Sequence, residues 1–155
     1  MKFEDMQVEG RYLCTLEAQV AAPFEMARHG DVSRRMIPIL GGTVTGRITG
    51  RITEGGADWQ FMNVKGVTDL EAHYCLELEG GDCVEVQSSG VRAASPEIIE
   101  RMMAGEQLSP DQYYFRTGIK IRTSSERYDW LTRFITVGIG TREKDRVIIR
   151  LFEIL

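Results

Sequence analysis

The short stretch from Gly55 to Gln60, Gly-Gly-Ala-Asp-Trp-Gln, gathers residue types that suit a small-molecule site. The paired glycines allow a backbone geometry that most residues cannot reach, so we expect a turn between two strands. In that turn Asp58 supplies an acid, Trp59 a large flat ring, and Gln60 both a hydrogen-bond donor and an acceptor. Two interpretations are open. The stretch forms half of a ligand site, or it is a structural corner in which Asp58 bonds the local backbone and Trp59 fills the core.

Acid–base chemistry at a carbonyl compound would use this stretch together with a few polar side chains elsewhere. An aspartate in an apolar pocket has a raised pKa and can exchange protons near neutral pH. An arginine can hold a substrate carboxylate or stabilise a developing enolate, and a tyrosine hydroxyl can donate to the same oxygen. We therefore predict catalytic roles for Asp58, Tyr74 and Arg116, and substrate-binding roles for Trp59, Gln60, Tyr114 and Arg133.

This set of residues favours a cofactor-free isomerase or cyclase of a small carbonyl compound, with no metal. One alternative is an ester or lactone hydrolase. Because the sequence has no Gly-x-Ser-x-Gly elbow and no metal-ligand cluster, Asp58 or His73 would have to activate water. Another is a non-catalytic binding protein for a small acidic or aromatic ligand, such as a carboxylate or a phenol. A structural alternative is an internal salt bridge between Asp58 and an arginine that locks the fold.

Strand-type alternation positions these residues along most of the chain. From Leu70 to Glu79, apolar residues occupy every second position and polar ones the positions between, which is typical of a half-buried strand. If the apolar row faces the core, His73 lies on the surface. Gly80-Gly81-Asp82 predicts a hairpin turn after this strand. Further strands are predicted at residues 11–20, 36–53, 60–65, 83–88, 113–121, 133–140 and 146–155.

Three other segments complete the predicted organisation. Residues 24–35 show no regular pattern and are predicted to be irregular. The recurring glycines of residues 41–50 lie among β-branched residues, which favours curved strands over a phosphate-binding loop. Residues 95–106 are predicted as a helix, because Ser95 suits the N-cap and Pro96 the first helical position. This helix could close one end of the fold.

About eight or nine strands with one short helix predict a mainly β protein. Frequent glycines favour a single closed antiparallel β-barrel over residues 1–155, with the apolar last strand pairing centrally or closing the barrel. Small closed barrels of this strand number can hold one compact ligand. The sequence therefore predicts one domain built around a small-molecule cavity.

Composition excludes several other classes of protein. The net charge of −4 lacks the basic character of a nucleic-acid binder, and no apolar run is long enough to span a bilayer. The N-terminus lacks the pattern of a signal peptide. The three cysteines are odd in number and widely spread, so no disulfide framework is expected. A cytoplasmic location is predicted.

Several separated motifs together resemble the bacterial and fungal family catalogued as domain of unknown function 3237. They follow the order of the family and cover nearly the whole chain: Gly55 to Gln60, Tyr74, Gly90 with Arg92, Tyr114-Phe115-Arg116-Thr117, Trp130-Leu131 with Arg133, and Val137-Gly138. The resemblance implies a lipocalin-like or allene-oxide-cyclase-like barrel that is often oligomeric, so a homo-oligomer is expected. It implies no shared activity.

The chain also departs from the family pattern at a few positions. Gly80-Gly81 replaces the usual Asp-Gly, and His73 replaces a frequent arginine. Gly118 and Ile121 stand where proline and phenylalanine are usual, and Thr132 where asparagine is usual. Because the last three lie near the predicted cavity, the shape of the pocket and the substrate cannot be transferred from the family.

Overall fold

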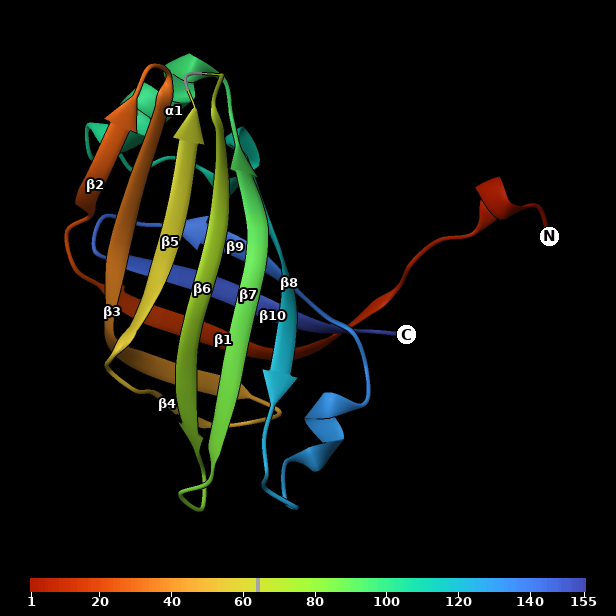
Figure 1. Cartoon of the computed structure of the whole chain (residues 1–155). Helices are drawn as coiled ribbons and strands as arrows, with labels where there is room; N and C mark the ends of the chain where they lie inside the picture. Colours follow the sequence, from red (N-terminus) through yellow and green to blue (C-terminus); the bar gives the residue numbers. More distant parts are fainter. Residues whose placement is uncertain (64) are drawn as a thin grey trace.

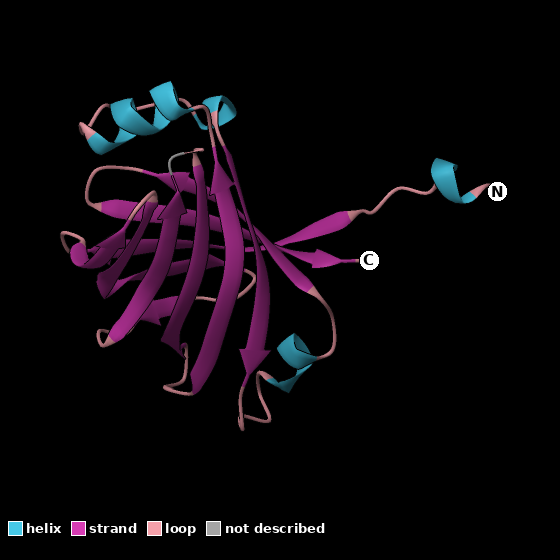
Figure 2. Ribbon diagram, turned by 45° about the horizontal axis from the view of Figure 1, so that its top comes forward, coloured by secondary structure: helices cyan, strands magenta, loops and turns pink. Residues whose placement is uncertain are grey.

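A closed antiparallel β-barrel forms the body of the protein (Figures 1 and 2). The computed structural model describes residues 1–63 and 65–155. Within these residues the strands are β1 (Gly10–Val20), β2 (Phe24–His29), β3 (Val32–Gly46), β4 (Gly50–Ile52), β5 (Gly56–Asn63), β6 (Val67–Leu78), β7 (Cys83–Ala93), β8 (Tyr114–Arg122), β9 (Thr136–Arg142) and β10 (Arg146–Ile154). The barrel closes because β1 pairs with β10 on one side and with the second half of β3 on the other. The predicted β-barrel is confirmed.

The long strand β3 joins the two ends of the sheet. Its first half pairs with β5 and the edge strand β2, and its second half with β4 and β1. The change of partners occurs around Gly41 and Gly42, where a Cβ on Gly42 would collide with the carbonyl oxygen of Glu17. Glycine therefore permits the close approach of β1 that closes the barrel. This confirms that the recurring glycines belong to curved strands.

The alternation predicted for β6 and β8 separates the barrel interior from the outside. Leu76 and Leu78 are almost fully buried on β6, whereas Glu71 between the inward positions is exposed. The β6–β7 hairpin turns at Gly80 and Gly81, as predicted, and the final strand β10 lies centrally between β1 and β9. The main cluster of buried apolar side chains extends from the end near this hairpin as far as Val20, Ile37 and Ile39. A smaller cluster packs against α1: Leu70, Leu108, Tyr113 and Phe115. Members of the main cluster include Leu13, Cys14, Ile52, Leu76, Leu78, Val84, Val86, Ile121 and Leu151.

Helix α1 (Pro96–Met103) lies across the opposite end of the barrel (Figure 2). The Ser95 hydroxyl accepts a hydrogen bond from the Ile98 N–H at 3.3 Å, so the predicted N-cap is confirmed. The helix ends before the predicted Glu106, because Gly105 takes a positive φ of +84° that breaks the helical geometry. Short 3₁₀ turns lie at Phe3–Asp5, Pro110–Gln112 and Asp129–Thr132. No helix within the described ranges is long and apolar enough to cross a membrane.

The prediction that residues 24–35 are irregular is wrong. They form a hairpin in which β2 pairs antiparallel with the start of β3. All six residues of β2 are exposed, and a register shift interrupts the pairing between Glu25 and Ala27. The strand is therefore held by backbone pairing without a buried face. A segment with no buried face has no hydrophobic alternation by which to recognise it.

Candidate functional site

Asp58 and Trp59 belong to strand β5 and point to opposite sides of the barrel wall. The turn ends early: Gly55 has a φ of +103°, and β5 begins at Gly56. Because successive side chains of a strand alternate, Asp58 faces the interior, whereas Trp59 is 39% exposed on the outside. The prediction of a turn that presents the acid beside the indole is wrong. The alternative in which Trp59 fills the core is wrong as well.

Asp58 is held by a short chain of hydrogen bonds inside the barrel. The Gln60 Nε2 donates to Asp58 Oδ2 at 2.7 Å, and Gln60 Oε1 in turn accepts from Arg35 Nε at 2.8 Å. The other oxygen, Asp58 Oδ1, is buried and has no hydrogen-bond partner among the described residues. A buried polar atom without a partner is costly, so it indicates a place where a ligand can bind. Asp58 thus has one carboxylate oxygen fixed by Gln60 and one without a protein partner.

A small inner pocket of about 50 Å³ adjoins Asp58. Its polar residues besides Asp58 are Tyr74, Ser88, Thr117 and Arg142, and Thr117 Oγ1 is likewise buried without a partner. Burial raises the pKa of Tyr74, so its hydroxyl keeps its proton and can donate a hydrogen bond. The remaining lining is apolar: Leu16, Ala18, Val20, Ile37, Ile39, Leu70, Ala72, Phe115, Val147 and Ile149.

The pKa of Asp58 is raised above that of an ordinary aspartate because burial disfavours the charged form. The hydrogen bond from Gln60 and the positive charges of Arg92, Arg35 and Arg142 act in the opposite direction and limit the rise. The carboxyl group therefore binds a proton more readily than an exposed aspartate does, while the arginines still favour its charged form. This balance suits a group that both accepts and returns a proton.

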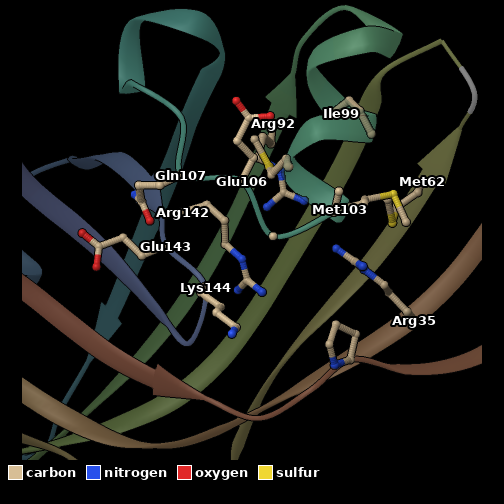
Figure 3. A pocket seen from close by; sticks show the side chains of 14 residues that line it. Arg35, Met62, Arg92, Ile99, Met103, Glu106, Gln107, Arg142, Glu143 and Lys144 are labelled. Atoms are coloured by element: carbon tan, nitrogen blue, oxygen red, sulfur yellow. The ribbon is translucent and has the colours of Figure 1, made fainter.

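Three arginines from different strands point into a wider chamber of about 380 Å³ that helix α1 also lines (Figure 3). Arg35 comes from β3, Arg92 from β7 and Arg142 from the end of β9, and Arg142 borders both the chamber and the inner pocket. Arg92 is only 3% exposed, and its Nε is buried without a partner. Its guanidinium carbon lies 5.9 Å from the centre of the Phe115 ring. We call this space the arginine chamber.

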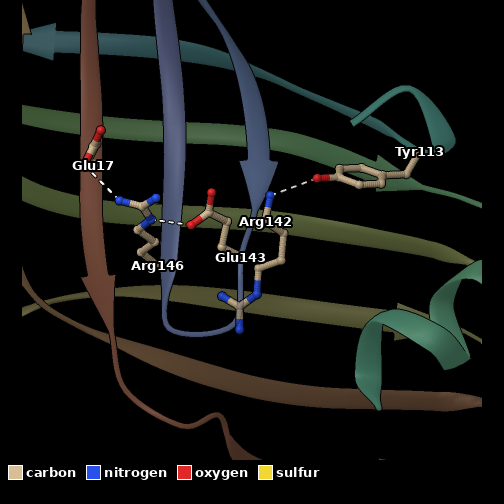
Figure 4. A network of polar contacts seen from close by, with 5 residues as sticks. All are labelled: Glu17, Tyr113, Arg142, Glu143 and Arg146. Atoms are coloured by element: carbon tan, nitrogen blue, oxygen red, sulfur yellow. Dashed lines mark hydrogen bonds and ion pairs between the residues drawn. The ribbon is translucent and has the colours of Figure 1, made fainter. Parts of the chain in front are cut away.

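The two acidic residues that line the arginine chamber are bound to other arginines. Glu106 accepts from Arg101 Nε at 2.9 Å. Glu143, next to Arg142 in the chain, pairs with Arg146, which also reaches Glu17 at 3.3 Å (Figure 4). The guanidinium group of Arg142 does not pair with either acid. Its backbone N–H donates a hydrogen bond to the Tyr113 hydroxyl at 3.0 Å. Within the described residues, none of the three chamber arginines forms an ion pair.

Burial and mutual repulsion act on the chamber arginines. Burial and the neighbouring Arg35 and Arg142 lower the pKa of Arg92 to about 10. The pKa values of Arg35 and Arg142 are also lowered, mainly by burial. All three remain protonated at neutral pH.

Asp58 forms no ion pair within the described part of the chain, so the alternative of an internal salt bridge is wrong. The site holds excess positive charge beside a single acid.

The structure brings together only some of the predicted site residues. Asp58, Gln60 and Tyr74 face the interior. Tyr114 is 54% exposed, and the Arg116 guanidinium lies 5.2 Å from the centre of its ring on the outside of β8. Outside the barrel too, Arg133 pairs with Asp129 at 2.6 Å, His73 pairs with Glu85 at 3.1 Å, and Trp59 borders a shallow groove. The surface position predicted for His73 is confirmed.

Arg35, Arg92 and Arg142 belong to the site but are absent from the residues predicted for it. Each lies two positions along from an inward-facing residue of its strand: Ile37, Gly90 and Gly140 respectively. Alternation extended to the end of each strand therefore predicts that these three side chains face the barrel interior. No group of three or more His, Cys, Asp or Glu side chains in the described residues is arranged to hold a metal ion.

Comparison with known proteins finds relatives that match the chain over nearly its full length. A UPF0311 protein of Bradyrhizobium diazoefficiens is 34% identical over 148 residues, covering 96% of this chain and 97% of that protein. A conserved protein of unknown function from Rhodopseudomonas palustris has a crystal structure that matches with a TM-score of 0.91 at 33% identity, covering 97% of this chain and 99% of that one.

A β-barrel-like protein from Acinetobacter baumannii matches with a TM-score of 0.82 at 30% identity, covering 99% of this chain and all of that one. Residues 9–154 match the family described as protein of unknown function DUF3237. The resemblance found in the separated motifs is thereby confirmed, and the chain belongs to the DUF3237 family.

Proposed function

We propose that this barrel is a cofactor-free enzyme, of isomerase or cyclase type, that moves a proton at a carbon next to a carbonyl group of a small anionic compound. The observation that carries the proposal is the buried, unpartnered Oδ1 of Asp58. Asp58 lines a mainly apolar pocket together with Arg142, and Arg142 joins Arg35 and Arg92 in the chamber, where none of the three has an ion-pair partner in the described structure. Asp58 and the three arginines thus lie near one another without forming an ion pair.

In the proposed reaction Asp58 Oδ1 accepts a proton from the carbon next to the carbonyl group. The resulting negative charge develops on the carbonyl oxygen, where Arg142 can stabilise it because this residue borders both cavities. In a substrate with a carbon–carbon double bond conjugated to the enolate, the protonated Asp58 then returns the proton to the far carbon of that system, so that the double bond changes position and the enzyme is restored. Gln60 holds the carboxyl group in place throughout.

Two features weigh against the hydrolase alternative. His73, one of the two residues that would activate water, lies on the outer face and pairs with Glu85. The inner pocket beside Asp58 is only about 50 Å³, which leaves little room for both an ester group and an attacking water molecule. A purely binding barrel differs in one measurable respect: it would hold the ligand without exchanging its protons.

Deuterium exchange tests the proposal before the true substrate is known. The protein is incubated in D₂O with small 2-oxo acids, and loss of the signal from the hydrogens next to the carbonyl is followed by proton NMR. We expect exchange above the rate without protein, and a fall of about 10²-fold or more in Asp58→Asn, the usual contribution of an acid–base group. Arg116→Ala, on the outer face, is the control and should exchange like the wild type. Equal rates in Asp58→Asn and wild type would exclude acid–base catalysis by Asp58.

A further inference from the structure

We infer that the substrate of this site is a small dicarboxylate, a statement that rests on the proposed function of the same cavity. One developing enolate needs one or two positive donors for its stabilisation. The arginine chamber supplies three guanidinium groups from three strands, converging on one space (Figure 3). The excess of positive charge therefore points to a substrate that carries permanent negative charges, in addition to the charge that develops on the enolate.

The charges around the chamber set the expected charge of the ligand. Arg35, Arg92 and Arg142 contribute three buried or partly buried positive charges, and Asp58 offsets at most one of them. Lys144 also lines the chamber, but its side chain is exposed, so water and salt screen its charge. The acids Glu106 and Glu143 are committed to Arg101 and Arg146. About two positive charges are therefore left over, in a site where Arg92 is almost fully buried. A dianion neutralises them, whereas a monoanion leaves one buried charge uncompensated, which is costly.

The form of the chamber favours carboxylates over phosphate. Phosphate groups commonly bind where several backbone N–H groups converge, as at the N-terminus of a helix. Here the second half of α1 lines the chamber, with Ile99, Met102 and Met103, so the helix N-terminus is not presented to the ligand. The planar guanidinium fork matches the two oxygens of a carboxylate. Three separate forks suit two carboxylates on one short chain.

The sizes of the two cavities orient such a ligand. The charged groups fit the arginine chamber of about 380 Å³, whereas the inner pocket of about 50 Å³ has room for only a small uncharged part of the molecule. Arg142 lines both cavities, and Asp58 lines the inner one. The carbon that loses its proton therefore lies between the carboxylates and the inner end of the substrate.

Isothermal titration with two matched probes tests the inference. 2-Oxoglutarate and 2-oxopentanoate have the same number of carbons and the same keto acid group, and they differ in the second carboxylate. We expect the wild-type protein to bind 2-oxoglutarate at least about tenfold more tightly, because the second carboxylate gains a charge-assisted contact in a partly buried site. Arg142→Gln should remove most of that preference, and Arg35→Gln provides a second variant in case the first does not fold. Arg116→Ala should keep the full preference.

The outcomes separate this inference from the proposed function. Asp58→Asn should stop deuterium exchange yet keep or strengthen binding of 2-oxoglutarate, because it removes a negative charge from the site. Undiminished exchange together with a retained dicarboxylate preference would overturn only the proposed reaction. Equal binding of the two probes, tighter binding of inorganic phosphate, or no binding of either probe at millimolar concentration would overturn the dicarboxylate.

Discussion

The two halves of the barrel are built from the same strands but from different inward-facing residues. Strand β7 shows the change within a few positions: Val84 and Val86 point into the half near the β6–β7 hairpin, and Ser88, Gly90 and Arg92 into the half under α1. We call these the apolar half and the polar half. The backbone pairing of β7 with β6 and β8 continues through both. The change is one of side chains, not of backbone architecture.

This difference separates stability from chemistry along each strand. The apolar half has a continuous core of fully buried aliphatic side chains such as Leu76 and Leu151. The polar half contains two cavities, the unpartnered oxygen of Asp58 and the unpaired chamber arginines. Unpaired buried charges destabilise a fold, so the larger apolar cluster has to offset them, with a smaller contribution from the cluster that packs against α1. Substitutions in the two halves should therefore have opposite consequences.

The largest effect is expected in the apolar half. Leu151→Ala removes a fully buried side chain from the core and should lower the free energy of unfolding by about 2–5 kcal/mol, through lost burial and the cavity left behind. Urea denaturation followed by circular dichroism measures this change. The folded fraction should still prefer 2-oxoglutarate to 2-oxopentanoate. A cost well below about 1 kcal/mol would mean that the apolar half is not the source of stability.

In the polar half a substitution of similar size should act in the other direction. Arg92→Met removes a buried guanidinium group whose Nε has no partner and keeps much of its volume, so we expect the free energy of unfolding to rise by about 1–3 kcal/mol. The same variant should lose dicarboxylate binding. Denaturation and titration of one preparation test both effects. A destabilised Arg92→Met would show that this arginine supports the fold, and the contrast between the halves would fail.

The pH dependence of stability gives a smaller and more specific contrast. The pKa of Asp58 in the folded protein is raised above the ordinary value of 3.8, so the native state holds this proton more tightly than the unfolded chain does. The associated stability is fully present below about pH 3.8 and is lost as pH rises through the raised pKa. Asp58→Asn cannot titrate. Its stability relative to the wild type should therefore increase over this pH interval and then level off, as measured by urea denaturation at a series of pH values. A constant difference across the interval would mean that the pKa of Asp58 is not raised.

The fold could be predicted from the sequence because burial leaves a periodic signal. The alternation of Leu70 to Leu78 identified both the strand and its inward face, and the glycines marked where the sheet bends. The same reasoning failed for β2, whose side chains are all exposed. It also failed for the relation between Asp58 and Trp59, because the end of a turn decides whether neighbours share a site or face opposite ways.

The site was harder to predict because it is assembled from strand ends. Arg35 lay in a segment predicted to be irregular, and Arg142 lay beyond the predicted end of its strand at Gly140. Arg92 was part of the resemblance to the family, but nothing in its immediate sequence indicated burial. A charged residue at an inward position of a strand has no apolar signature of its own. Only the closed barrel shows that these three strand ends meet at one mouth.

The smallest effect is expected outside the barrel, and it tests whether position or residue type decides function. Arg116 and Arg142 are both strand arginines, but Arg116 points outward against Tyr114, whereas Arg142 points into the arginine chamber. Arg116→Ala should change the free energy of unfolding by no more than about 0.5 kcal/mol and leave both titration and deuterium exchange as in the wild type. Denaturation, titration and NMR on this variant beside Arg142→Gln make the comparison direct. If Arg116→Ala instead lost binding, the working site would lie on the outer face beside Trp59 and Tyr114, and the unpaired chamber arginines would need another explanation.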